Sequence, residues 1–354
     1  MSRAFVHHAV SARVVFGAGA RARLPEEADR LGLRALLVVC TPGHADVAAE
    51  VASTLGERVA DVHPDAAMHV PAAVAAKAVA RADALGADGC LAVGGGSAIG
   101  LAKAIAKDTG LPIIALPTTY AGSEMTSVWG VTDAGCKTTG RDPRVRPVTV
   151  VYDPELTVTL PPAASITSGI NAIAHSAEAL YAPDGSPLTA LVAAESVRAL
   201  HRALPLLATN PTAVDARADA LYGAWLAGTT LESTTMSLHH KLCHVLGGMF
   251  DLPHGPTHTA VLPHVLAVNL RAAPQAHAML ADALGAPDPA AEMFGFAARL
   301  GAQMALADLG LPADGLDAVI AQVLAAPYAN PVPVTAAVLR DIVQHALLGV
   351  APKS

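Results

Sequence analysis

The chain has few of the features that mark secreted, membrane-spanning or nucleic-acid-binding proteins. Its 4 cysteines are scattered without a CxxC pair, so we expect reduced thiols and no disulfide framework. No run of about 18 residues is free of polar and charged side chains, and the start lacks the apolar core of a signal peptide. A net charge of −7 gives no reason to expect nucleic acid or anionic membranes as partners. We therefore expect a cytoplasmic protein.

The chain does have enough apolar material for a large core. Hydrophobic residues make up 53% and charged residues 15% of 354 residues, which excludes a disordered chain and favours two domains. In residues 1–155, short β-rich runs alternate with Ala-rich helical stretches, a pattern typical of a parallel sheet covered on both faces. A helix is expected over 72–85, and strands over 13–16, 35–39, 89–93, 112–116 and 148–152.

After Asp153-Pro154 the pattern changes to long Ala/Leu-rich helical runs. The expected breaks between them are Pro161-Pro162, Asn210-Pro211, Gly247-Gly248 and Pro253. The sequence therefore predicts an α/β domain over 1–155 and an all-helical domain over 156–354.

Two segments of the first domain are suited to a polar ligand. Gly94-Gly95-Gly96-Ser97 lies between a strand and a helix, where backbone amides and the helix N-terminus favour a pyrophosphate. A tight turn would need the same glycines, so the motif alone leaves both interpretations open. The hydroxyl-rich loop Pro117–Thr126 follows another strand, at the edge of a parallel sheet where ligands bind. A solvated loop is the alternative there.

Gly17–Ala22 matches the dinucleotide fingerprint GxGxxG/A more literally. However, the next strand ends in Val39-Cys40-Thr41-Pro42, with no acid to bind the ribose. We therefore interpret Gly17–Ala22 as a turn. An acid after the strand would also repel the 2′-phosphate of NADP, so its absence implies tolerance of NADPH as well as NADH.

The second domain contains a set of histidines at helical spacing. His240 and His244 are one turn apart, Asn171 and His175 have the same spacing, and His254 stands in a Pro-His-Gly turn. The group resembles a metal site in which one ligand expected to be charged is a neutral Asn. Histidine is both a common metal ligand and a general acid near neutral pH. Separately hydrogen-bonded histidines are the alternative.

Together, these motifs resemble the iron-containing alcohol dehydrogenase family, through Gly94–Ser97, Pro117–Thr119, Gly169–His175 and His240-x3-His244-x9-His254. Within this family, three segments are most similar to the maleylacetate reductases: Lys137–Pro147, His239–Gly248 and Phe250–His254. The resemblance implies a dehydroquinate-synthase-like fold with NADH or NADPH in the cleft between the domains. It assigns cofactor binding to Gly94, Gly95, Gly96, Ser97, Thr118, Thr119, Thr126, Lys137 and Thr41. A homodimer is the expected assembly.

The chain departs from the metal-dependent members of that family. His175, His240 and His254 match their metal-binding histidines, but Asn171 stands where they have Asp, and their GGGSxxD motif ends in Gly100. A neutral Asn does not offset the charge of a dication as a carboxylate does. We therefore expect no tightly bound metal, as the resemblance to maleylacetate reductases also implies.

The resemblance implies reduction of the C=C bond of maleylacetate to 3-oxoadipate, in the breakdown of aromatic compounds. Hydride addition to that bond yields an enolate, which imidazoles and a lysine can stabilise and protonate. The alternatives are a metal-dependent alcohol dehydrogenase or carbonyl reductase, a dehydroquinate-synthase-like lyase and a non-catalytic ligand-binding relative. The residues expected to be catalytic are His244, His240, His175, His254 and Lys241.

Overall fold

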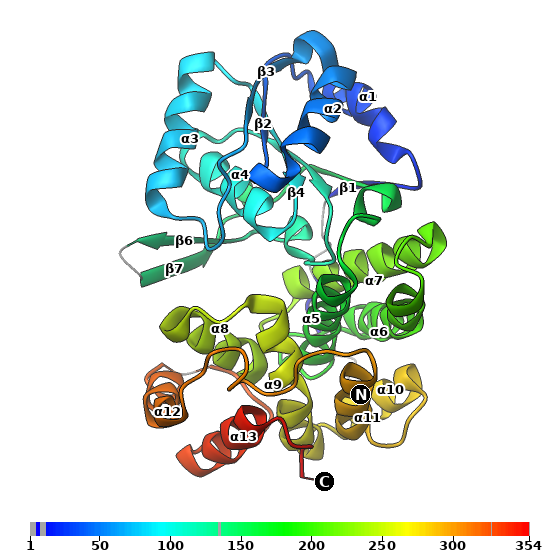
Figure 1. The fold of residues 1–354 in the computed structure, drawn as a ribbon, viewed down its shortest axis with the longest axis vertical. Coiled ribbons are helices and arrows are strands. Elements are labelled where there is room, and N and C mark those ends of the chain that lie inside the picture. The colour runs from blue at the N-terminus through cyan, green and yellow to red at the C-terminus, as the bar shows by residue number, and fades with distance from the viewer. Residues whose placement is uncertain (1–4, 8–11, 134–135, 327, 354) are drawn as a thin grey trace. The chain divides into compact units, whose positions relative to one another are not determined.

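The computed structural model describes residues 5–7, 12–133, 136–326 and 328–353, without the side chains at 136 and 137. It contains two compact units (Figure 1). One is the described part of residues 10–160, and the other is that of residues 161–354 together with residues 5–7. The described part of the chain has no helix that is long and apolar enough to cross a membrane.

A parallel sheet forms the centre of the first unit. Its strands are, in spatial order, β1 (Arg13–Phe16), β8 (Thr149–Tyr152), β5 (Ile113–Pro117), β4 (Gly89–Gly94), β2 (Leu36–Val39) and β3 (Val59–His63). The sheet thus confirms the expected strands to within a residue or so at each end. Strand β3 was not expected, because this half-buried edge strand contains Asp61 and His63 and lacks an apolar run.

Helices cover both faces of the sheet, as the alternating pattern predicted. Leu36 and Val38 pack in one cluster with α1 (Leu24–Leu31) and α2 (Ala45–Leu55). Leu37 and Val39 pack in a different cluster, with α3 (Ala72–Leu85) and α4 (Gly96–Thr109). An antiparallel hairpin of β6 (Val128–Asp133) and β7 (Cys136–Arg141), which the sequence did not predict, follows β5 in the chain.

The strand order fixes where a ligand can approach the sheet. The chain runs from β2 outward to β3 and returns to place β4 on the other side of β2. The connections therefore diverge at the carboxyl ends of β2 and β4. Open α/β sheets bind ligands in the crevice at such a point. Thr41 and Gly94–Ser97 both lie there.

The second unit is helical, as expected. Its helices are α5 (Pro162–Leu180), α6 (Pro187–Thr209), α7 (Val214–Ser233), α8 (Leu238–Phe250), α9 (His254–Asn269), α10 (Pro274–Leu284), α11 (Pro289–Arg299), α12 (Leu316–Leu324) and α13 (Ala336–Leu348). Gly169 positions α5, because a Cβ there would lie 2.6 Å from Leu204 Cδ2 of α6. The close approach that glycine permits places Asn171 and His175 in the interior.

Two expectations about the histidine segment are wrong. Helix α8 does not break at Gly247-Gly248 but runs to Phe250, and Asp251 then takes a left-handed conformation with φ 53°. Each helical glycine costs about 1 kcal/mol, less than burial of the apolar face of α8 contributes. His254 is not in a turn but is the first residue of α9.

Candidate active site

The Gly94–Ser97 segment forms a tight turn from β4 into α4. Gly94 has φ 142°, which favours glycine, and α4 begins at Gly96. A Cβ on Gly95 would lie 2.8 Å from Thr119 Cγ2, so glycine lets the loop after β5 lie against the turn. Backbone N–H groups at the start of α4 are thus available at the crevice, as phosphate binding requires.

His44 connects two of the expected cofactor-binding residues. Its Nδ1 lies 2.9 Å from Thr41 Oγ1, and its Nε2 lies 3.1 Å from Thr118 Oγ1. Burial lowers the pKa of His44, which favours a neutral ring that donates one hydrogen bond and accepts the other. The structure therefore brings Thr41, Thr118, Thr119 and Gly94–Ser97 to one edge of the sheet. Sequence reasoning did not single out His44.

Thr126 is placed differently from the other hydroxyls. It is 1% exposed, and its Oγ1 accepts from the buried Lys103 Nζ at 2.9 Å and donates to the Ser123 carbonyl at 3.0 Å. Lys103 also donates to the carbonyl of Val128 at 2.7 Å. These contacts hold the loop after β5 in place. The side chain of Lys137 lies outside the described residues.

Gly17–Gly19 form a turn, as the missing acid indicated, and the turn continues into a short 3₁₀ helix, Ala20–Arg23. The N–H groups of Gly19 and Arg21 donate to the two carboxylate oxygens of Asp153, each at 3.1 Å. A phosphate would need these amides, and a buried carboxylate of the same unit already binds them.

In the helical unit, a chain of hydrogen bonds links four side chains of α5 and α8. Asn171 Nδ2 lies 3.3 Å from His175 Nε2, and His175 Nδ1 lies 2.7 Å from His240 Nε2. His240 Nδ1 lies 2.7 Å from Glu178 Oε2. All four side chains are buried. Sequence reasoning missed Glu178, although it stands about one helical turn after His175 on α5.

His239 and His258 form a second buried pair beside this chain. His239 Nε2 lies 2.9 Å from His258 Nδ1, and burial lowers the pKa of both rings well below the ordinary value. The His258 ring lies 4.2 Å from that of His254 and 5.0 Å from that of His240. The structure thus adds two neutral imidazoles to the cluster, neither of which the sequence assigned a role.

The remaining expected residues lie toward the surface of the cluster. His244 and His254 are exposed, and Lys241 is half-buried. The His244 ring stands edge-on to that of His240 at 6.2 Å. Exposure suits groups that exchange protons with solvent or contact an entering substrate.

The buried donor set does not fit a divalent metal in this arrangement. Two nitrogens on one tetrahedral metal are about 3.3 Å apart, whereas His175 Nδ1 and His240 Nε2 are separated by a hydrogen-bond distance of 2.7 Å. Asn171 adds no negative charge. The nearby group of His239, Cys243 and His258 is also unsuited to a divalent metal. Burial and then the Glu178 charge raise the Cys243 pKa well above its ordinary value, disfavouring the thiolate that a metal would bind.

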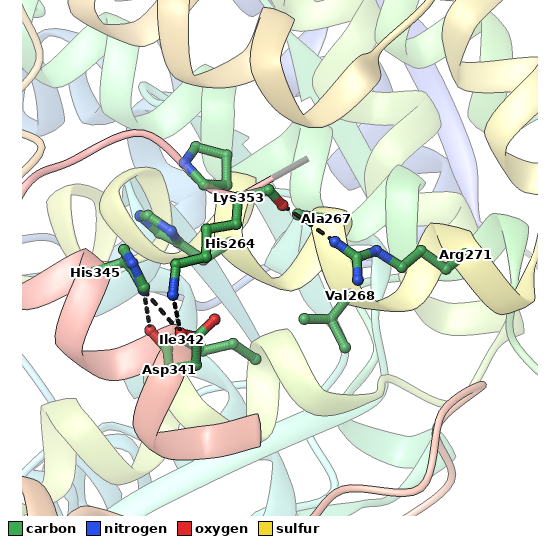
Figure 2. Close-up of a pocket in the computed structure, with 9 residues that line it drawn as sticks. His264, Ala267, Val268, Arg271, Asp341, Ile342, His345 and Lys353 are labelled. Carbon is green, nitrogen blue, oxygen red and sulfur yellow. Dashed lines mark hydrogen bonds and ion pairs between the residues drawn. The ribbon is translucent and has the colours of Figure 1, made fainter. Parts of the chain in front are cut away.

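A separate pocket of about 230 Å³ lies beside the carboxyl-terminal part of α9, in the same unit (Figure 2). Lys353 Nζ donates to Asp341 Oδ1 at 2.9 Å, and Arg271 donates to the Lys353 carbonyl at 3.2 Å. None of the expected site residues lines it. The histidine cluster is therefore the stronger candidate for the chemistry.

Comparison with known proteins identifies the family. Residues 11–154 match the family described as iron-containing alcohol dehydrogenase. Residues 165–347 match the C-terminal part of the Fe-containing alcohol dehydrogenase family. Together these matches extend over most of the chain, which therefore belongs to the iron-containing alcohol dehydrogenase family.

Within that family, the chain is similar to proteins named maleylacetate reductase. The protein of that name from Sphingobium indicum is 50% identical over 348 residues, covering 98% of this chain and 99% of the relative. A second, from Burkholderia cepacia, is 50% identical over 349 residues, covering 99% of each chain. The crystal structure of maleylacetate reductase from Agrobacterium tumefaciens has a TM-score of 0.95 at 49% identity and covers 99% of both chains.

The Gly94–Ser97 assignment can be tested at Gly96. A Cβ there would meet no protein atom within 4 Å, so Gly96→Ala should not strain the fold. The free energy of unfolding should stay the same or rise slightly, because alanine has less conformational freedom in the unfolded chain. A methyl group beside the phosphate should raise the dissociation constant of NADH about tenfold or more. Gly95→Val should also weaken binding, partly by displacing Thr119. Differential scanning calorimetry measures the stability, and fluorescence titration measures the dissociation constant of NADH. Unchanged NADH affinity in both Gly96→Ala and Gly95→Val would show that the cofactor does not bind at Gly94–Ser97.

Asn171→Asp tests the missing charge. A carboxylate at this position should raise the affinity of chelator-stripped protein for Zn²⁺ by about tenfold or more. Isothermal titration calorimetry gives the constants. The control is Asn210→Asp, at an exposed position after α6, which should not change the affinity. Equal Zn²⁺ affinity for wild type and Asn171→Asp would contradict the claim that the neutral side chain of Asn171 weakens metal binding.

Proposed function

We propose that the chain is a maleylacetate reductase, which uses NADH or NADPH to reduce the C=C bond of maleylacetate to 3-oxoadipate in aromatic-compound breakdown. The observation that carries the proposal is the buried chain from Asn171 through His175 and His240 to Glu178. Three members of this chain, Asn171, His175 and His240, stand at positions that match the family's metal ligands, and here they bind one another. The 44–50% identity to curated maleylacetate reductases supports the same reaction.

The reaction is balanced without an added Lewis acid. Hydride from the nicotinamide adds to the alkene carbon remote from the ketone, and the electron pair of the C=C bond moves toward the ketone oxygen. The resulting enolate then takes a proton at the carbon next to the ketone. NADH, one proton and maleylacetate thus give NAD⁺ and 3-oxoadipate. Hydrogen-bond donors suffice to stabilise the enolate.

The protein groups have separate roles in this proposal. Turn amides at Gly94–Ser97 bind the cofactor pyrophosphate, with Thr41, Thr118 and Thr119 contacting the rest of the cofactor. His244 delivers the proton, and Lys241 binds one substrate carboxylate, because a dianion needs cationic partners. His175, His240 and His254 supply hydrogen-bond donors and acceptors next to the reacting atoms of the substrate.

Metal-dependent carbonyl reduction is the alternative within the family. It requires a cation to stabilise an alkoxide at the carbon that receives the hydride. The short contact between His175 and His240 and the neutral Asn171 favour enolate chemistry instead. We propose accordingly that no tightly bound metal takes part. A homodimer and a cytoplasmic location remain predictions.

The experiment that tests the function follows the hydrogen isotope. Incubation with maleylacetate and NADH carrying deuterium at the transferable position should give 3-oxoadipate. The deuterium should be on the carbon remote from the ketone, as measured by mass spectrometry and NMR. A hydroxy acid with deuterium on its carbinol carbon would instead identify a carbonyl reductase.

Variants of α8 test the two catalytic roles. His244→Ala should lower kcat by about a hundredfold or more, the usual scale of general acid catalysis. Lys241→Ala should mainly raise KM for maleylacetate and leave KM for NADH unchanged. Steady-state kinetics with each substrate varied in turn separates these effects. Wild-type kinetics in both variants would refute the assignments while leaving the reaction itself in place.

Cofactor tolerance follows from the end of β2. With Cys40 and Thr41 there and no carboxylate, the 2′-phosphate of NADPH meets no acidic side chain in the segment that ends β2. The kcat/KM values for NADH and NADPH should lie within about two orders of magnitude of each other. A preference for NADH above about a thousandfold would be incompatible with this explanation.

A further inference from the structure

We propose that Glu178 is a positioning residue that sets the direction of every hydrogen bond from His240 to Asn171. The inference rests on the proposed function only for its effect on turnover, since the hydrogen-bond direction itself can be observed without substrate.

The contacts of Glu178 define it as an acceptor. The carboxylate is 0% exposed and lies on α5 opposite the first turn of α8. Its oxygens accept from the backbone N–H of Ser237 at 2.9 Å and of His239 at 2.8 Å. A backbone N–H can only donate, so both oxygens of Glu178 act as acceptors in these contacts, and a carboxylate has no hydrogen to donate.

The acceptor role fixes the tautomer of His240. Its Nδ1 must carry the hydrogen that Glu178 Oε2 accepts at 2.7 Å. In a neutral imidazole the other nitrogen then has a lone pair, so His240 Nε2 accepts. His175 Nδ1, 2.7 Å away, must therefore be the donor.

The same reasoning extends to Asn171. A neutral imidazole with its hydrogen on Nδ1 has a lone pair on Nε2, so His175 Nε2 accepts from Asn171 Nδ2 at 3.3 Å. The amide orientation follows, and Asn171 Oδ1 faces away from His175. That oxygen is buried and has no hydrogen-bond partner among the residues that the structure describes. It is thus an acceptor available to an N–H or O–H group of a bound molecule.

The substitution Glu178→Gln would remove this constraint. The new side-chain amide could donate to His240 Nδ1, which would reverse each hydrogen bond in turn and replace the Asn171 oxygen with its NH₂ group. The side-chain volume would hardly change, so the effect would come from hydrogen-bond direction, from charge and from the loss of the acceptor that binds the Ser237 N–H. In the serine-protease triad, the corresponding exchange of carboxylate for amide acts through the wrong histidine tautomer.

Nitrogen-15 NMR of the full-length protein labelled at histidine tests the inference directly. The chemical shift of a ring nitrogen distinguishes one that carries hydrogen from one with a lone pair. Wild type should have hydrogen on Nδ1 of both His240 and His175 and lone pairs on both Nε2 atoms. Assignment uses His240→Asn and His175→Asn. Hydrogen on His240 Nε2 with a bare Nδ1 would overturn the inference.

Kinetics then tests the consequence for turnover. Glu178→Gln should lower kcat about a hundredfold and change KM for NADH less than about threefold. Glu178→Asp, which keeps the charge, should recover part of the lost kcat. The control, Glu195→Gln, removes a partly exposed carboxylate of α6 and should behave as wild type. Wild-type kcat in a folded Glu178→Gln variant would overturn the proposal.

The two proposals can fail separately. If wild type did not reduce maleylacetate, the proposed function would fail, yet the nitrogen shifts would still decide the role of Glu178. If Glu178→Gln did not fold, the wild-type spectrum alone would give the decision.

Discussion

The histidine cluster depends on one buried carboxylate, that of Glu178. Burying a carboxyl group is costly unless hydrogen-bond donors compensate its oxygens. Here the compensation comes from the first N–H groups of α8 and from the ring of His240. The same contacts attach α8 to α5 and thereby bring His240 of one helix against His175 of the other. A single buried acceptor thus joins α5 to the start of α8 and binds one end of the chain of imidazoles.

This arrangement is the basis of our proposal that no tightly bound metal takes part in the reaction. A dication needs several lone pairs directed at one point and enough negative charge to offset it. In this chain the His175 and His240 nitrogens face each other at 2.7 Å, and Asn171 is neutral. Reduction of a conjugated alkene needs less stabilisation of the anion than carbonyl reduction does, because the negative charge is spread over an enolate. Hydrogen-bond donors can stabilise such an anion.

The sequence predicted those features that depend on local pattern. Leu36–Val39 and Ile113–Pro117 are apolar runs buried on both faces, and such runs indicate a parallel sheet. Helical spacing likewise placed Asn171 beside His175. Patterns failed where tertiary context decides. The edge strand Val59–His63 has no apolar run, and the two glycines of α8 are accommodated because the surrounding apolar residues are buried.

The missed residues of the site have a common cause. Glu178 binds backbone N–H groups about sixty residues later in the chain. Every residue except proline has such a donor, so the sequence does not indicate which one a carboxylate will bind. His258 meets His239 only because α9 packs against α8. His44 likewise connects Thr41 with Thr118 across two strands of the sheet. Each of these roles depends on contacts between elements. The two pairs expected from the sequence, Asn171 with His175 and His240 with His244, each lie within one helix.

The most direct test of this account is the activity of enzyme freed of metal. Protein dialysed exhaustively against a strong chelator, with residual iron and zinc measured by mass spectrometry, should oxidise NADH with maleylacetate at nearly the untreated rate. Added Fe²⁺ or Zn²⁺ should give no increase. Loss of activity on chelation and its recovery with either metal would contradict the account.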